Sequence, residues 1–258
     1  MTSLGHDRYC DELLRQTSLF REALAGADLT ATVPTCPEWT LGELTRHLGR
    51  AHRWVETIVR TKATERVPSG QVPDSAGAGD DDPAALDAWL AAGAARLAAT
   101  LRAAGPDAGV WTWMDDQHAG FWARRMVHET AVHRADAALT AGVPFEVEPE
   151  VAADTIDEWL EILAFAQASG DEDVAGLRGA GRSIHLHATD AADAEWLIEF
   201  GEDGFSWRRG HEKATVALRG PLTDVLQVFY RRLPAGSDRV EVLGDRELLD
   251  FWLERASF

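Results

Sequence analysis

The sequence predicts a fold in two parts, an N-terminal four-helix bundle followed by a small α+β domain with an antiparallel sheet. Apolar residues recur in steps of three and four through most of the chain up to Gly170, which is the period of an amphipathic helix. Beyond that glycine, short segments alternate apolar and polar residues with a period of two, which is typical of half-buried strands. We therefore expect one domain over residues 1–145 and a second over residues 146–258.

Four helices are expected in the first part. The first covers residues 7–24 and ends at an Ala-Gly-Ala-Asp stretch. The second begins at Thr40, which forms a T-x-x-E capping box with Glu43, and continues for about 20 residues. The third covers 83–105 and starts with a proline, a residue favoured in the first turn. The fourth runs from about 120 to 141. Helices of this length with polar outer faces are typical of an antiparallel bundle.

The segment between the second and third predicted helices has a different character. Residues 62–82 are rich in Pro, Gly, Ser and Asp and show no apolar periodicity. Such a stretch is typical of a long loop, or of a mobile segment over an entrance.

The second part is predicted to begin with a bridging helix over 149–168, within residues 146–170. Period-two segments separated by Asp/Gly turns follow it, and they indicate a small antiparallel meander. A helix from Pro221, a short strand at 240–242 and a closing helix over 245–255 complete an α+β arrangement. The segments predicted to form the meander are 182–187, 195–200, 205–207 and 213–218.

The composition limits the partners that the protein can have. The 258 residues carry a formal net charge of −18 at neutral pH, and residues 146–258 hold most of the acidic excess. A surface of this sign repels phosphate backbones and anionic lipid headgroups. We therefore expect neither a nucleic-acid partner nor a membrane partner.

The cysteines and the N-terminus indicate a cellular location. Cys10 and Cys36 are the two cysteines, and they lie outside any C-x-x-C spacing, so neither a disulfide framework nor a cysteine metal site is indicated. The chain begins without a signal-peptide pattern, and no uncharged apolar run approaches the ~20 residues that span a bilayer. We expect a soluble cytoplasmic protein, whose oligomeric state the sequence leaves open.

The predicted fourth helix carries the main candidate for chemistry. His128 and His133 are five residues apart, about 140° around a helix, so they cannot share a metal ion. Glu129 and His133 are four apart and can direct a carboxylate oxygen and an imidazole nitrogen to one point. A third ligand must come from another helix, and the second helix offers His47 and His52 on opposite sides of its apolar stripe. Spacing does not choose between them, and a polar pair on a solvated helix face is the alternative.

Other polar residues have simpler explanations. Arg124, Arg125 and Arg134 on the same predicted helix are expected to be ordinary surface charges. His185 and His187 are two apart on one face of a predicted strand, a spacing that can bind metal. A solvated face of a half-buried sheet explains these two histidines more simply.

Seven short motifs occur in order along the chain. Each is weak alone, but their order and spacing together are specific. They resemble the mycothiol-dependent maleylpyruvate isomerase family of the DinB-like superfamily, over nearly the whole chain. The motifs are VPTCPEWT at 33–40, L-x-x-H-L at 44–48, HETAVHRAD at 128–136, HATD at 187–190, EW at 195–196, LRGP at 218–221 and LGD at 243–245.

The resemblance implies a DinB-like metal-binding bundle whose metal ligands are His47, Glu129 and His133. The match to W-x-x-x-x-L-x-x-H, which begins at Trp39, selects His47 over His52. Two histidines and one carboxylate suit Zn²⁺, or another divalent metal, and leave one coordination position open. That arrangement is typical of a catalytic site.

Two further residues take implied roles from the same resemblance. Asp136 is suited to orient an imidazole, and a helix-surface role explains it as well. The segment 230–234 is similar to a Gly-Arg segment of the family that is linked to binding of the thiol cofactor, and Arg232 is the matching position. Arg231 stands where a glycine is common. Two arginines that complement a helix C-terminus are the simpler explanation.

The activity that the resemblance implies is that of a zinc-dependent enzyme. It would activate a low-molecular-weight thiol, mycothiol, for S-transfer to a small electrophilic substrate or for cis-trans isomerisation of that substrate. A thiol that coordinates Zn²⁺ loses its proton near neutral pH and becomes a nucleophile. The same ligands can activate water, so a zinc-dependent hydrolase is an alternative. A non-catalytic small-molecule-binding protein that retains a structural metal is another.

Overall fold

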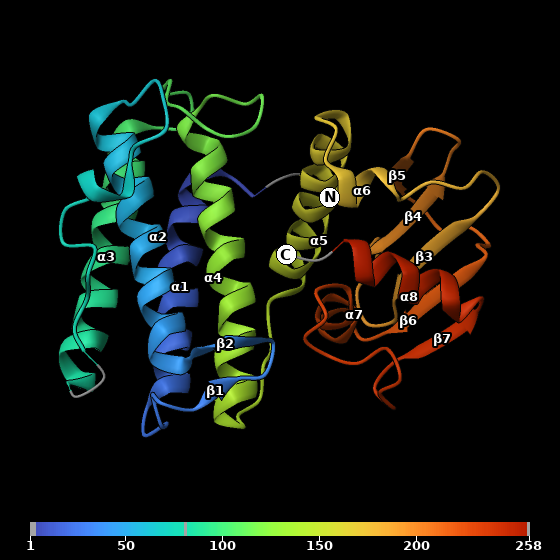
Figure 1. Cartoon of the computed structure of the whole chain (residues 1–258), viewed down its shortest axis with the longest axis horizontal. Helices are drawn as coiled ribbons and strands as arrows, with labels where there is room; N and C mark the ends of the chain where they lie inside the picture. Colours follow the sequence, from blue (N-terminus) through green and yellow to red (C-terminus); the bar gives the residue numbers. More distant parts are fainter. Residues whose placement is uncertain (1–3, 80–81, 257–258) are drawn as a thin grey trace. The chain divides into compact units, whose positions relative to one another are not determined.

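The computed structural model describes residues 4–79 and 82–256, and it divides into two compact units (Figure 1). One unit ends at Phe145 and the other begins at Glu146. The predicted fold class, a helical bundle followed by an α+β domain, is confirmed. Among the described residues, no helix is both long enough and apolar enough to span a membrane.

The first unit is a bundle of four helices (Figure 1). Helices α1 and α2 each pack against both α3 and α4. The core between them is apolar, with Leu13, Leu48, Leu97 and Val127 fully buried. All four helices begin and end within about one residue of the predicted positions. They are α1 (His6–Leu24), α2 (Leu41–Thr61), α3 (Pro83–Ala104) and α4 (Ala119–Ala141).

The start of α2 is fixed by the predicted capping box. The backbone N–H of Glu43 donates to the Thr40 hydroxyl (3.2 Å), and the backbone N–H of Thr40 donates to the Glu43 carboxylate (2.8 Å). These two bonds satisfy N–H groups that have no partner within the helix. The cap therefore sets where α2 begins, and with it the position of His47 in the second turn.

Replacing the capping hydroxyl tests this role. We expect Thr40→Ala to lower the free energy of unfolding by about 1 kcal/mol, because the Glu43 N–H loses its acceptor. Urea denaturation at neutral pH measures the change. Thr40→Ser, which keeps the hydroxyl, is the matched control, and equal losses in the two variants would contradict the assignment.

A two-stranded hairpin that the sequence did not predict joins α1 to α2. Its strands β1 (Thr32–Val33) and β2 (Cys36–Thr40) pair in antiparallel fashion, and Val33 is fully buried in the cluster that contains Leu41 and Leu44. β1 has two residues, and β2 contains a proline and does not alternate buried and exposed residues, so neither strand shows a period of two. The hairpin contacts both α2 and α4.

The described part of the predicted loop at 62–82 is tied to the bundle. It contains one short turn, η1 (Ser69–Gln71). The Asp74 carboxylate accepts hydrogen bonds from Arg53 of α2 (3.1 and 3.2 Å) and Arg96 of α3 (3.2 Å), and its carbonyl accepts one from the indole of Trp89 (2.9 Å). Residues 80 and 81 of the prediction lie outside the described residues.

The second unit contains one mixed sheet whose strand order is β5-β4-β3-β6-β7. Three of its four pairings are antiparallel, but β3 and β6 run parallel, with Ile184 opposite Val216. The predicted antiparallel meander is therefore wrong for β6, which pairs with β3 and not with β5. The strands are β3 (Ser183–Ala188), β4 (Glu195–Phe200), β5 (Phe205–Arg209), β6 (Val216–Gly220) and β7 (Glu241–Gly244).

The parallel pairing depends on the link between β5 and β6, residues 210–215. At its start, the backbone N–H of Gly210 donates to the Glu195 carbonyl (3.1 Å), at the first residue of β4. At its end, the backbone N–H of Ser183 donates to the Thr215 hydroxyl (3.0 Å), at the first residue of β3. Because β3 and β4 are antiparallel, these two anchors lie at opposite ends of the strands. The link therefore crosses one face of the sheet.

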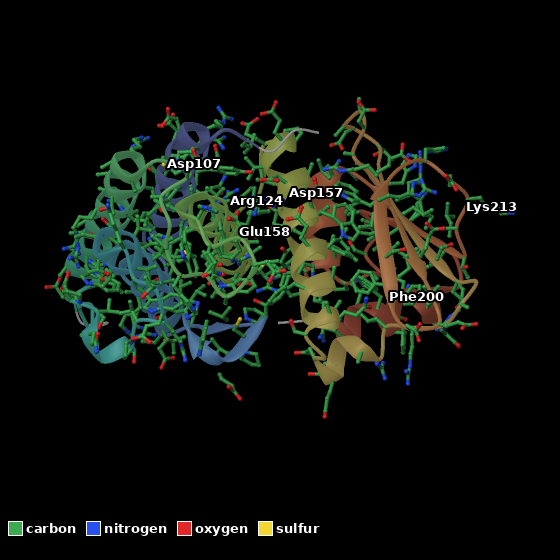
Figure 2. The ribbon with its side chains drawn as sticks, turned by 90° about the horizontal axis from the view of Figure 1, so that it is seen from above. Asp107, Arg124, Asp157, Glu158, Phe200 and Lys213 are labelled. Carbon is green, nitrogen blue, oxygen red and sulfur yellow. The ribbon has the colours of Figure 1, made fainter. Side chains whose placement is uncertain are left out.

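Helices cover the other face of this sheet (Figure 1). The indole of Trp196 donates to Asp157 of α5 (2.7 Å), and the rings of Phe200 and Phe205 pack against Trp252 of α8. Figure 2 shows Asp157 and Lys213, a residue of the link, on opposite sides of the sheet. The helices described in this unit are α5 (Pro149–Ala168), α6 (Glu172–Ala175), α7 (Leu222–Phe229) and α8 (Arg246–Arg255), and of these α5, α7 and α8 contact the strands.

Candidate metal centre

Three of the predicted site residues converge in the bundle. His47 Nε2 of α2 lies 3.1 Å from Glu129 Oε1 of α4, and His133 Nε2 lies 3.3 Å from the same oxygen. The two imidazole rings are 4.9 Å apart between centroids. The i,i+4 relation of Glu129 and His133 places both on one face of α4, and the contact between α2 and α4 brings His47 to them.

The donor atoms suit a small tetrahedral cation. Two imidazole nitrogens and one carboxylate oxygen are ligands that Zn²⁺ binds at about 2.0–2.1 Å. Ligands at that radius lie about 3.3–3.4 Å apart along the edges of a tetrahedron, close to the two contacts of His47 and His133 with Glu129. The spacing of the donors therefore fits a zinc-like ion.

His52 lies away from this group. Its side chain is fully buried, and its Nε2 is 3.0 Å from the hydroxyl of Thr130. Burial lowers the pKa of His52 to about 3, so the imidazole is neutral in the folded protein. The structure thus brings His47, and not His52, to Glu129.

The buried neutral His52 should make stability depend on pH. Between pH about 6.5 and about 3 the unfolded chain takes up a proton here that the folded chain does not, so this contribution is present above pH 6.5 and is lost as the pH falls. At pH 5 the loss is about 2 kcal/mol. Lowering the pH from 7 to 5 should reduce the free energy of unfolding of both proteins. We expect the reduction in His52→Gln to be smaller than that in wild type by about this amount. Urea titrations at both values measure it, and parallel losses would contradict the prediction.

Asp136 holds the ring of His133 from the side away from the centre. Its Oδ2 lies 2.9 Å from His133 Nδ1, and its Oδ1 accepts a hydrogen bond from the Thr35 hydroxyl of the hairpin (2.5 Å). The carboxylate is fully buried. A carboxylate on Nδ1 leaves Nε2 of the same ring free to face a metal, which is the usual arrangement around metal-binding histidines.

Arg125 holds the second oxygen of Glu129. Its guanidinium donates to Glu129 Oε2 at 2.6 Å, which leaves Oε1 for the two imidazoles. Burial alone would raise the pKa of Glu129, but the hydrogen bonds and charges of His133, His47 and Arg125 outweigh it and hold that pKa well below its ordinary value. The carboxylate therefore stays ionised, as a metal ligand must be.

The charge state of His133 follows from the same contacts. Burial acts to lower the pKa of His133, but the hydrogen bonds to Asp136 and Glu129 and their charges raise it to about 9. Without a metal ion, both ring nitrogens therefore carry a proton at neutral pH, and the ring is positively charged. A bound cation would take the place of that positive charge.

Trp39 of the hairpin flanks both imidazoles. Its ring centroid is 4.6 Å from that of His47 and 6.2 Å from that of His133. The sequence offered Trp39 and Thr35 only as residues of the VPTCPEWT family motif, without the contacts that they make. The i,i+4 spacing of Arg125 and Glu129 was the one local signal that could have marked Arg125 as a partner.

The expectation that the arginines of α4 are ordinary surface charges is wrong for two of them. Arg125 is buried against Glu129, and Arg134 is buried as well. The Arg134 guanidinium donates to the side chain of Gln16 (2.7 Å) and lies over the ring of Phe145. Long side chains of this kind can bury their stems and still find partners for the charged group.

Arg232 lies in the other unit, in the turn after α7. Its guanidinium donates to the carbonyl of Tyr230 at 2.7 Å. The preceding residue, Arg231, has a φ of 62°, in the left-handed region that favours glycine. This backbone conformation is a physical reason why glycine suits that position.

A surface depression is separate from the convergent residues. It has a volume of about 700 Å³ and lies where the end of α2 meets the following loop, with Thr57, Arg60 and Gln71 in its lining. Thr57 is ten residues beyond His47, about 15 Å along the helix. The depression is therefore not part of the candidate metal centre.

Fold and site together define a two-domain protein with a histidine–glutamate cluster in its helical bundle. The family of mycothiol maleylpyruvate isomerase N-terminal domains matches residues 10–138, and that of the C-terminal domains of the same isomerase matches residues 150–251. The chain therefore belongs to the mycothiol maleylpyruvate isomerase family, a family of enzymes, and the sequence prediction of this family is confirmed.

Solved structures agree on the fold. Crystal structures of the mycothiol-dependent maleylpyruvate isomerase and of a histidine-to-alanine variant of it are 18% and 16% identical to this chain. Each match has a TM-score of 0.57 and covers 94% of this chain and 95% of the other. No curated protein sequence matches.

Proposed function

We propose that this protein is a metal-dependent isomerase that uses a low-molecular-weight thiol, mycothiol, to isomerise a small electrophilic substrate. The observation that carries the proposal is the convergence of His47, Glu129 and His133 on the bundle of a chain from this family. S-transfer of the same thiol to an electrophile would use the same centre. Neither Cys10 nor Cys36 forms a disulfide within the described residues, which suits the reducing cytoplasm where we place the protein.

The three ligands would hold Zn²⁺ and leave one position open. When bound there, Zn²⁺ would lower the pKa of a coordinating thiol and so supply a thiolate nucleophile at neutral pH. Asp136 fixes the ring of His133 with Nε2 toward the centre, and Arg125 keeps Glu129 ionised and oriented. These residues prepare the ligands before any metal or thiol arrives.

The centre is accessible to small molecules. The side chain of His47 is 33% exposed, against 18% for Glu129 and 12% for His133. A thiol and a small electrophile can therefore approach from the side of His47. The role of Arg232 in holding the thiol cofactor remains a part of the proposal that rests on the family resemblance.

Removing a ligand tests the metal assignment. We expect His47→Ala, Glu129→Gln and His133→Ala each to lose the zinc ion of the bundle centre and to lower thiol-dependent isomerisation more than 100-fold, since two ligands do not retain the ion. Metal analysis of the purified proteins and an isomerisation assay with mycothiol and maleylpyruvate measure both quantities. His118→Ala is the matched control, because His118 also pairs with a carboxylate, Asp116 (2.7 Å), but at an exposed position.

The results of this experiment separate the candidate functions. Full zinc content in all three ligand variants would contradict the metal assignment. If the variants lose the zinc ion of the bundle centre and the wild-type protein hydrolyses the substrate without thiol, the zinc hydrolase is favoured. Zinc binding with no turnover of either kind would favour a binding protein with a structural metal.

Asp136 should act on affinity through His133. We expect Asp136→Asn to weaken zinc binding at the bundle centre 10- to 100-fold, because an amide does not hold the Nδ1 proton as a carboxylate does. Competition with a chromophoric chelator measures the affinity. Thr35→Val, which removes only the outer hydrogen bond to Asp136, should have a smaller effect, and wild-type affinity in Asp136→Asn would contradict this positioning role.

A further inference from the structure

The C-terminal sheet carries a second group of histidines on the face that the 210–215 link crosses. In β3, Ile184 and Leu186 are buried in the core, so His185 and His187 between and after them face the other way. Glu195 of β4 lies directly opposite His187 in the pairing of the two strands, on the same face. The 210–215 link places His211 over the same face. Elements far apart in sequence thus bring four possible ligands together.

The three imidazoles all approach the same carboxylate oxygen of Glu195. His185 Nε2, His187 Nδ1 and His211 Nδ1 lie 2.8, 3.0 and 2.6 Å from Glu195 Oε2. His185 is only 5% exposed, although an exposed sheet face was the simpler expectation from its spacing. The ring of His211 from the link lies against that of His185, and the expectation of a solvated face is wrong for His185.

Hydrogen bonding alone satisfies this arrangement poorly. A carboxylate oxygen offers about two lone pairs, so three N–H donors to one oxygen exceed what it accepts well. Each facing nitrogen would also have to carry its proton. A cation at the same point would instead accept a lone pair from every imidazole and from the carboxylate.

The ring spacing agrees with a shared tetrahedral ion. The three centroids are 5.3, 5.5 and 5.5 Å apart, close to an equilateral triangle. Imidazoles bound to one zinc ion at about 2.0–2.1 Å have centroids about 5 Å apart, because each centroid lies behind its nitrogen. Two arginines on the same face, Arg208 and Arg219, pair with Glu212 (2.6 Å) and Glu241 (2.8 Å) and not with Glu195.

We propose that His185, His187, Glu195 and His211 form a second metal site, for a borderline divalent cation such as Zn²⁺, which fastens the 210–215 link to the sheet. Three nitrogens and a single carboxylate suit zinc-like ions, whereas Ca²⁺ and Mg²⁺ require more oxygen ligands. Four protein ligands fill a tetrahedral zinc ion and leave no position for substrate. The site is therefore structural, unlike the three-ligand centre in the bundle, and it does not rest on the function proposed for that centre.

Metal stoichiometry tests the proposal. The full-length, untagged protein is stripped with a chelator and titrated with Zn²⁺ against a chromophoric competitor. We expect two equivalents for wild type and for the control His118→Ala, and one equivalent for the double variant His47→Ala/His133→Ala. The double variant His185→Ala/His187→Ala should also bind one, and the combination of all four substitutions should bind none.

A milder variant keeps the test informative if His185→Ala/His187→Ala does not fold. His211 has a side chain 73% exposed on the link, so His211→Ala removes one ligand with little loss of packing. In the His47→Ala/His133→Ala background, we expect it to weaken zinc binding at least 10-fold. Zn²⁺ should raise the melting temperature of the His47→Ala/His133→Ala protein, and the rise should be smaller when His211→Ala is added.

Several outcomes would overturn the second site. The first is that His47→Ala/His133→Ala binds no zinc. The second is that His185→Ala/His187→Ala still binds two equivalents. The third is that His211→Ala leaves the zinc affinity of the His47→Ala/His133→Ala protein unchanged. If the bundle centre binds no zinc but the second site does, the His47→Ala/His133→Ala protein still binds one equivalent. The failure of one proposal can therefore be distinguished from the failure of the other.

Discussion

The carboxylate of Glu129 is contacted from two helices, and the geometry of the bundle centre depends on it. One oxygen faces the imidazoles of His47 and His133, and the other accepts from the buried guanidinium of Arg125. A carboxylate that is mostly withdrawn from water, as this one is, is tolerated only when its oxygens are paired. The packing of α2 against α4 must therefore satisfy this polar contact as well as fill the apolar core.

The hairpin between α1 and α2 adds further contacts to the residues around Glu129. It places the hydroxyl of Thr35 on the buried carboxylate of Asp136, which in turn holds His133, and it lays the ring of Trp39 against His47. Both imidazoles thus have contacts besides those with Glu129, one to Trp39 and one to Asp136. A centre built this way has its ligands in place in advance, which favours both metal affinity and a defined open position.

The C-terminal sheet repeats this chemistry with a different result. In each unit two or three imidazoles face one carboxylate oxygen, but the bundle supplies three candidate ligands and the sheet four. The number of ligands decides whether a position remains for a substrate. The crossing of the 210–215 link over the sheet supplies the fourth residue, so the same link that makes β6 pair with β3 in parallel also completes the cluster.

Local relations were readable from the sequence, because they lie within one element. The helix periods, the Thr40 capping box and the i,i+4 spacing of Glu129 and His133 depend only on helix geometry. The family motifs added the preference for His47 over His52, which periodicity could not supply. Relations between elements required the tertiary structure: the burial of Arg125, the hairpin contacts, the parallel strand pair and the approach of His211 to β3. Those depend on the paths of loops and the packing of helices, which bring together residues whose separation in sequence carries no period.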